Sequence, residues 1–239
     1  MGVGNGLGRS SPLSLVGQRT EATFYARYLS RARPTVLVLG CGAGRIPWEL
    51  SDQGAEAVGV DPSASLIAAA EERRATEATP KADRVRFLSA DLRSLRLGRR
   101  FALVIAPNNA FGLMSASTDL EALLATARQH LAADGVLVFD VVNATRAFDH
   151  SRQHPESGLS LFQRPAIRGV FAPHLRERRR SGLNRSASIR RLHLRQLNLE
   201  HVESAIRDAG FASTEKYGRY DGKPFEPADP IQIVVAQLA

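Results

Sequence analysis

The chain has 239 residues, of which 44% are hydrophobic and 23% charged, and its formal net charge is +8. This length and composition predict one folded domain and argue against a disordered or collagen-like chain. A single cysteine, Cys41, excludes an intrachain disulfide and favours a reducing compartment, so we expect a cytoplasmic protein. No apolar run approaches the ~20 residues of a membrane helix, and we interpret residues 1–19 as a flexible Gly/Ser-rich lead-in.

The positive charge is concentrated in one segment. Between Arg164 and Arg195 the chain has ten arginines, no lysine and one acid, Glu177, so the remaining residues are close to neutral in sum. A basic segment is compatible with nucleic acid, nucleotide-linked small molecules or acidic partners. Because the whole chain uses 29 arginines and three lysines, a merely solvated arginine-rich stretch explains the segment equally well.

Helices and strands are predicted to alternate through the first 143 residues. The apolar spacing predicts, in chain order, a helix at 20–32, a strand at 35–40, a helix at 45–53, a strand at 55–61, a helix at 63–79, strands at 85–91 and 101–109, a helix at 118–131 and, after a turn at Asp134–Gly135, a strand at 135–143. Strands that alternate with helices in this way predict a parallel sheet with helices on both faces.

The alternation stops in residues 144–197, which are polar, basic and contain three prolines. We expect an inserted cap of irregular chain with short strands. The pattern then resumes with a helix at 199–211, a strand at 212–219, a turn at Asp221–Gly222 and a last strand at 231–238. Two successive strands without a helix between them must pair antiparallel. Residues 20–239 are therefore predicted to form one Rossmann-like α/β domain, with a seven-stranded, mostly parallel sheet whose last strand is antiparallel.

The most informative segment is VLVLGCGAGR, residues 36–45. Gly40, Gly42 and Gly44 lie where a buried strand passes into a helix. Glycine permits a sharp turn there and lets a ligand approach the bare main chain, while the helix start offers unpaired N–H groups. The dinucleotide fingerprint would require a third glycine where this chain has Arg45, so a different adenosine-containing ligand is favoured. A tight strand–helix turn without a ligand is the alternative.

Acids end the next two predicted strands. Asp61 follows Gly40 by 21 residues and could accept both hydroxyls of a ribose, or could instead cap the following helix with Ser63. Asp91 could accept a hydrogen bond from the exocyclic amine of an adenine, with Leu92 as an apolar neighbour, or could simply form a turn. Because the carboxyl ends of parallel strands meet at one edge, the glycine loop and both acids are predicted to form one site.

Taken together, these motifs resemble the class I S-adenosylmethionine-dependent methyltransferases, and in particular their small-molecule branch. VLVLGCGAGR resembles the first motif of that family, VGVDPS the second and VRFLSADLRSL the third, and the terminal hairpin is also similar. The resemblance spans roughly residues 23–143 and 197–238 and implies S-adenosyl-L-methionine as cofactor. It assigns to the cofactor site Tyr25, Gly40, Cys41, Gly42, Gly44, Asp61, Pro62, Asp91, Leu92 and Pro107. The chain departs from the family at Val38, where an acid usually organises the loop.

The residues after the fourth strand face the expected methyl group. Asn108 and Asn109 could orient a polar acceptor, and a turn after Pro107 is an equal alternative. Tyr25 could close over the cofactor or pack in the core. Cys41 has no adjacent base and is expected to pack. The histidines His150, His154 and His193 offer no compelling base, and no metal site is predicted. An amine acceptor, which needs no base, is therefore slightly favoured over a hydroxyl.

The resemblance implies methyl transfer to a small-molecule acceptor. In that family the 144–197 position holds a substrate lid or a dimer contact, and its arginines here would suit a phosphorylated or carboxylated acceptor. An RNA methyltransferase that uses the Arg164–Arg195 segment is one alternative, and a non-catalytic cofactor-binding scaffold is another. No membrane partner is expected, nucleic acid is less favoured than a small molecule, and an oligomer is compatible with the sequence.

Overall fold

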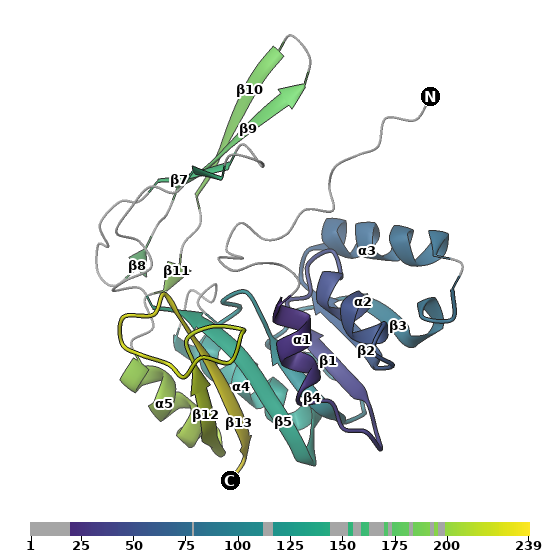
Figure 1. Cartoon of the computed structure of the whole chain (residues 1–239), viewed down its shortest axis with the longest axis vertical. Coiled ribbons are helices and arrows are strands. Elements are labelled where there is room, and N and C mark those ends of the chain that lie inside the picture. Colours follow the sequence, from purple (N-terminus) through teal and green to yellow (C-terminus); the bar gives the residue numbers. More distant parts are fainter. Residues whose placement is uncertain are drawn as a thin grey trace.

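The computed structural model of the chain describes residues 20–77, 79–111, 117–143 and 199–239, together with the backbone of short strands between 153 and 195 (Figure 1). The elements, in chain order, are α1 (Thr20–Ala26), β1 (Thr35–Leu39), α2 (Arg45–Ser51), β2 (Glu56–Asp61), α3 (Ala64–Thr76), a 3-10 helix (Ala82–Arg84), β3 (Val85–Ser89), β4 (Phe101–Ala106), α4 (Ser117–His130), β5 (Leu131–Val142), β6 (Gln153–His154), β7 (Leu159–Phe162), β8 (Val170–Phe171), β9 (His174–Ser181), β10 (Asn184–Arg191), β11 (Leu194–Arg195), α5 (Leu199–Asp208), β12 (Phe211–Tyr217) and β13 (Ile231–Leu238).

The main sheet has seven strands in the order β12-β13-β5-β4-β1-β2-β3, which confirms the predicted fold class. The pairs from β5 to β3 are all parallel, and β13 pairs antiparallel with both β5 and β12. The reversed last strand is therefore inside the sheet, while β12 forms the edge. Burial explains this order, because six successive residues of β13 are buried on both faces whereas most of β12 is exposed.

Helices cover both faces of this sheet (Figure 1). On one face, Val36 and Val38 of β1 belong to a core that also contains residues of α1, α2 and α3. On the other face, Leu37 and Leu39 belong to a core with α4 and α5. The alternation along β1 follows from the two-residue period of a strand, and apolar residues on both sides are typical of a central parallel strand.

Two predicted boundaries differ from the structure by more than three residues. Helix α1 ends at Ala26 and not at residue 32, because the chain then turns through a hydrogen bond from the N–H of Arg27 to the carbonyl of Phe24 (3.2 Å). Strand β5 begins at Leu131, so Asp134–Gly135 lies inside it and not before it. The register with β4 shifts between Phe101 and Leu103, and this irregularity accommodates Asp134 and Gly135 within the strand.

The predicted insertion contains short strands. Strands β9 and β10 form an antiparallel pair that β7 and β6 extend to four strands, and β8 pairs with β11. Figure 1 shows these strands beyond the carboxyl ends of β4 and β5. The expected lead-in at 1–19, His150, His193 and the side chains of the Arg164–Arg195 segment lie outside the described residues.

Candidate functional site

The glycine loop between β1 and α2 has the backbone that the sequence predicted. Gly42 and Gly44 have φ values of 56° and 85°, in the left-handed region that side chains disfavour. A Cβ atom on Gly44 would lie 2.5 Å from the ring of Phe87, so this glycine is needed for packing. A Cβ atom on Gly42 would meet no described atom within 4 Å. Among the described residues nothing covers the main chain of Gly42, and uncovered main chain is a surface against which a ligand can lie.

The carboxylate of Asp61 lies at the end of β2 and joins the loop to the next helix. Its Oδ2 accepts a hydrogen bond from the N–H of Gly42 and its Oδ1 accepts one from the N–H of Ser63, both at 2.9 Å. Ser63 is the residue just before α3, so Asp61 restrains the entry to that helix, although no side-chain hydrogen bond caps the helix itself. Each oxygen retains a further lone pair, so the same carboxylate can still accept from a ribose.

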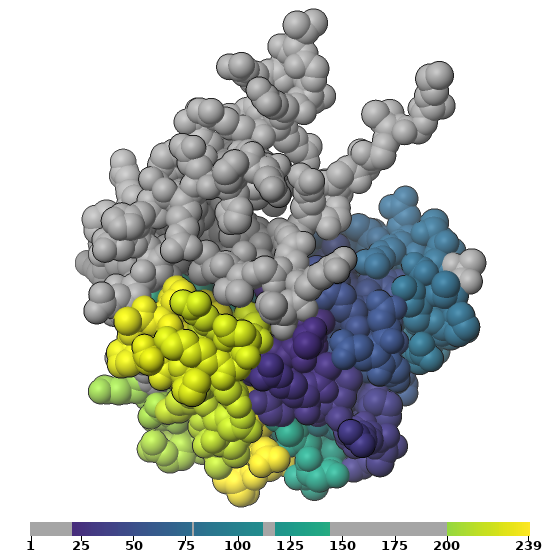
Figure 2. All heavy atoms as spheres, viewed as in Figure 1, coloured from purple at the N-terminus to yellow at the C-terminus, as the bar shows by residue number. Residues whose placement is uncertain are grey.

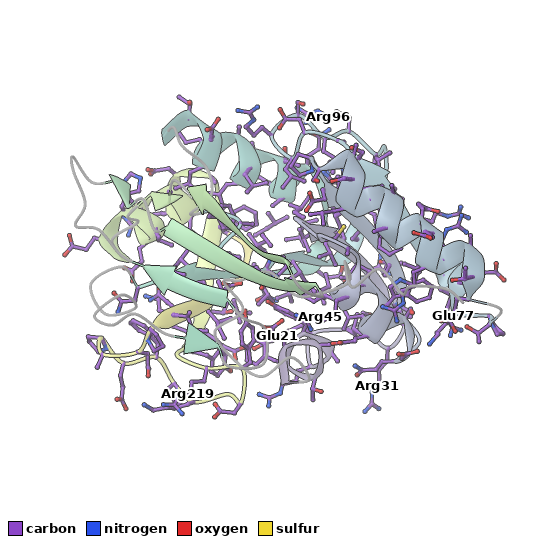
Figure 3. All side chains as sticks on the ribbon, turned by 90° about the horizontal axis from the view of Figure 1, so that it is seen from above. Glu21, Arg31, Arg45, Glu77, Arg96 and Arg219 are labelled. Carbon is purple, nitrogen blue, oxygen red and sulfur yellow. The ribbon has the colours of Figure 1, made fainter. Side chains whose placement is uncertain are left out.

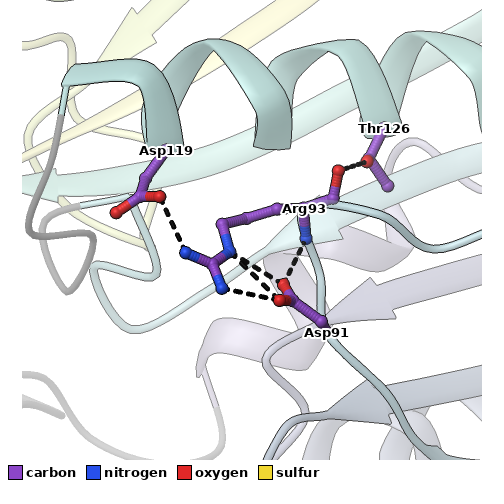
Figure 4. Close-up of polar contacts among 4 residues, drawn as sticks. All are labelled: Asp91, Arg93, Asp119 and Thr126. Carbon is purple, nitrogen blue, oxygen red and sulfur yellow. Dashed lines mark hydrogen bonds and ion pairs between the residues drawn. The ribbon is translucent and has the colours of Figure 1, made fainter.

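Asp91 lies two residues beyond the end of β3 and is held by Arg93 (Figure 4). The Nε and Nη2 atoms of Arg93 donate to the carboxylate at 2.9 and 2.6 Å, and the backbone N–H of Arg93 donates to it at 2.9 Å. These hydrogen bonds lower the pKa of Asp91 to about 2. Arg93 also donates to Asp119 on α4 at 2.9 Å. Arg93 was not predicted as a site residue, although the Asp-x-Arg spacing was an available signal. An adenine amine that binds Asp91 would have to share this carboxylate with Arg93.

Of three further residues that the resemblance assigned to the cofactor site, two are buried and one is exposed. Leu92 is buried near Gly40, Pro107 is buried after β4, and Pro62 is exposed. Cys41 is buried, and the position of a Cβ on Gly59 would be only 2.8 Å from its Sγ atom. Burial, reinforced by the charge of Asp61, raises the pKa of the Cys41 thiol. A protonated, enclosed thiol agrees with packing and not with nucleophilic chemistry.

The turn after β4 contains the two asparagines. Asn108 and Asn109 have φ values of 58° and 56°, an uncommon conformation for residues other than glycine. Asn109 is buried: its N–H donates to Oδ2 of Asp140 at 2.8 Å, and its side-chain oxygen accepts from the N–H of Val142 at 3.1 Å. Asn109 is therefore committed to the turn. Asn108 is partly exposed and remains the candidate for orienting an acceptor.

Tyr25, on α1, is fully buried against the loop that precedes β13. Its hydroxyl lies 3.2 Å from the hydroxyl of Tyr220, and burial raises the pKa of both tyrosines well above the ordinary value. Figure 2 shows the matching contact between the surface of α1 and residues of the 218–230 loop. The position agrees with the predicted core contact.

Arg45, the residue in place of the third glycine, links this region to the glycine loop. Its guanidinium pairs with the buried carboxylate of Glu21 on α1 and, at 3.2 Å, with Glu49 on α2. Figure 3 shows Glu21 and Arg45 pointing toward one another at this edge of the molecule. The ion pair fixes α1 beside the start of α2.

Asp140 is a site residue that the sequence analysis missed. It lies near the carboxyl end of β5, is 4% exposed, and its Oδ1 makes no hydrogen bond among the described residues. Burial raises the pKa of Asp140 to about 6, although the N–H of Asn109 and the neighbouring Tyr220 hydroxyl oppose the rise. The available signal was a single acid within the otherwise apolar stretch VLVFDVV, residues 136–142.

The carboxyl edge of the sheet brings these residues into one row. Asp91 follows β3, Asp61 ends β2, the glycine loop follows β1, Asn108 follows β4 and Asp140 lies on β5. With neighbouring strands about 4.8 Å apart, Asp61 and Asp140 are separated by roughly 14 Å across the sheet. An elongated ligand could therefore lie along the edge. Among the described residues there is neither a cluster of three metal-ligating side chains nor a helix able to span a membrane.

Residues 36–135 match a family model described as a methyltransferase domain. This range includes the glycine loop, Asp61, Asp91 and both asparagines. No curated protein matches the chain significantly.

Several solved structures share the fold over nearly the whole chain. An S-adenosylmethionine-dependent methyltransferase from Clostridium acetobutylicum is 16% identical with a TM-score of 0.82, and the alignment covers 95% of this chain and 94% of that one. The sugar N-methyltransferase KedS8 from Streptoalloteichus is 22% identical with a TM-score of 0.71 and coverage of 99% of both chains. The glycopeptide N-methyltransferase MtfA is 18% identical with a TM-score of 0.69 and coverage of 94% and 92%. MtfA has also been solved with S-adenosyl-L-methionine.

Proposed function

We propose that the chain is a class I S-adenosylmethionine-dependent methyltransferase and that it methylates a small molecule, with an amine favoured over a hydroxyl. The observation that carries the proposal is the open main chain at Gly42 beside the buried carboxylate of Asp61. This pair forms a cradle of the kind that an adenosine ligand requires, at the edge of the sheet where open α/β folds bind ligands.

The residues fit the cofactor. Gly40 and Gly42 would lie against its amino-acid end, Asp61 would accept from its ribose, and Asp91 with Leu92 would border its adenine. When bound, S-adenosyl-L-methionine supplies an electrophilic methyl group on a sulfonium. The chain's own residues would then bind and orient the two reactants and exclude water, and alignment of this kind is worth up to ~7–11 kcal/mol in favourable cases.

Two observations support an amine acceptor. A neutral amine attacks without a general base, and the buried histidine of the described part, His130, has both ring nitrogens in hydrogen bonds with the backbone of Thr126 and Leu97. The similar structures KedS8 and MtfA are described as N-methyltransferases. We further propose that residues 20–239 form the methyltransferase domain and that the 144–197 segment covers the acceptor.

Titration calorimetry with S-adenosylhomocysteine tests the cofactor site. We expect micromolar-range binding by the wild type and at least tenfold weaker binding by Asp61→Asn, because one carboxylate oxygen becomes an amide nitrogen that cannot accept. Glu56→Gln is the matched control, since Glu56 lies at the other end of the same strand and pairs with Arg99. Absence of binding by the wild type would overturn the proposal.

Transfer itself is tested by incubating the enzyme with radiolabelled S-adenosyl-L-methionine and a panel of amino sugars and their hydroxy analogues. Label should enter the amines in preference to the hydroxy compounds. Binding of S-adenosylhomocysteine without label in any member of a broad metabolite pool would instead indicate a scaffold without turnover.

A further inference from the structure

The turn after β4 is held in an unfavourable conformation by residues of β5. Two consecutive left-handed residues other than glycine, Asn108 and Asn109, cost of the order of 1 kcal/mol each. Two hydrogen bonds oppose this cost: the N–H of Asn109 donates to Asp140 at 2.8 Å, and the Asn109 side chain accepts from Val142 at 3.1 Å. Conformations of this kind persist only where the surroundings enforce them, and they concentrate at functional sites.

Asp140 carries a charge in an enclosed place. Glu21 and Tyr25 from α1 and Tyr220 from the loop before β13 surround it, and Asn108 and Asn109 approach it from the turn after β4. The nearby cation, Arg45, pairs with Glu21 and Glu49. Among the described residues Asp140 makes no ion pair, and its principal partner is the N–H of Asn109.

We propose that Asp140 is a positioning residue for methyl transfer, whose carboxylate fixes the Asn108–Asn109 turn in the form that leaves Asn108 exposed toward the acceptor. The effect on catalysis rests on the proposed function. The coupling between the charge of Asp140 and the conformation of the Asn108–Asn109 turn does not depend on it. A hydrogen bond to a charged acceptor is roughly twice as strong as one to a neutral group, so protonation of Asp140 weakens the restraint on the turn. Methyl transfer should therefore decline as the pH falls below about 6.

The coupling is tested without any acceptor by following the backbone amide signal of Asn109 in ¹⁵N NMR spectra between pH 4.5 and 8. In the wild type this signal should titrate with a midpoint near 6, because the amide donates directly to the titrating carboxylate. The titration should disappear in Asp140→Asn. It should persist in Asp134→Asn, the matched control, since Asp134 is an exposed acid on the same strand that pairs with Arg33. An Asn109 signal that does not titrate in the wild type, or that still titrates in Asp140→Asn, would overturn the proposal.

The catalytic consequence is tested with the acceptor amine found above. Asp140→Asn should lower kcat about tenfold at pH 7.5 and remove the acid limb of its pH profile, because misplaced acceptor-orienting groups slow alignment-dependent transfer. The KM for S-adenosyl-L-methionine should change less than twofold. Wild-type kcat across the pH range in Asp140→Asn would contradict the positioning role. Failure of the wild type to bind S-adenosylhomocysteine would overturn the proposed function and leave the NMR result to decide the coupling.

Discussion

Gly42 and Asp61 are joined by a 2.9 Å hydrogen bond between residues 19 positions apart in the chain. The bond runs from a loop that follows β1 to the end of β2, so it sets the loop's shape before a ligand arrives. The second carboxylate oxygen restrains the start of α3 through Ser63. One side chain therefore organises two segments of the site.

Removing this carboxylate should weaken the fold as well as the site. We expect Asp61→Ala to lower the free energy of unfolding by about 2–4 kcal/mol, because two backbone N–H groups lose a charged acceptor in a buried place. Urea denaturation measures the change. Glu56→Ala on the same strand should cost less than about 1 kcal/mol, since its ion pair with Arg99 is exposed. Equal effects of the two substitutions would contradict the role of Asp61.

Substituting alanine for each of two glycines of the loop should distinguish a glycine needed for folding from one needed for ligand binding. Gly44→Ala should destabilise the protein by about 3 kcal/mol or more, because left-handed strain adds to overlap with the Phe87 ring. Gly42→Ala should cost only about 1–2 kcal/mol, since its new methyl enters open space. Calorimetry should nevertheless show at least tenfold weaker binding of S-adenosylhomocysteine by Gly42→Ala. Unchanged affinity in that variant would mean that the ligand does not lie on this main chain.

Arg93 competes with an adenine amine for Asp91. Arg93→Ala should tighten binding of S-adenosylhomocysteine by up to about fivefold, because an exposed ion pair competes only weakly with the ligand. The pKa of Asp91 should return from about 2 toward the ordinary aspartate range, as measured by ¹³C NMR of the carboxyl group. Arg99→Ala, which disrupts another exposed pair, is the control. Weaker binding by Arg93→Ala would show that the arginine itself helps to hold the ligand.

Asp140 should make stability depend on pH in a particular direction. Its pKa is raised in the folded protein, so the folded state binds a proton more tightly than the unfolded state between about pH 4 and 6. The contribution of Asp140 to stability is therefore largest below pH 4 and declines as the pH rises to about 6, by up to about 3 kcal/mol. Urea denaturation of the wild type and Asp140→Asn across this range should show the difference. Parallel pH curves for the two proteins would exclude this titration.

The sequence predicted the fold well because apolar strands and glycine-ended turns are local signals. The strand at 231–238 was located to the residue, yet its place inside the sheet was not, since order in a sheet depends on which of two strands is more completely buried. The end of α1 was misplaced because a turn within a helical pattern leaves the apolar spacing unchanged.

The candidate site was predictable where one segment carries it and not where distant segments meet. The glycine loop and Asp61 follow from spacing alone. The commitment of Asn109 to Asp140 depends on β4 and β5 being neighbours, and the pairing of Glu21 with Arg45 depends on where α1 packs. The periodicity of a segment indicates whether it is a helix or a strand. Predicting these contacts also requires knowing which other element it packs against.

The interior place of β13 imposes an order on assembly during synthesis. Strands β1 to β5 can pair as soon as they leave the ribosome, but β12 is made before the strand that must separate it from β5. Until β13 emerges, the edge of β5 is unpaired and the apolar face of α5 has no sheet to cover. Nascent chains that stop before residue 231 should therefore engage chaperones and be more susceptible to proteases than chains that include it.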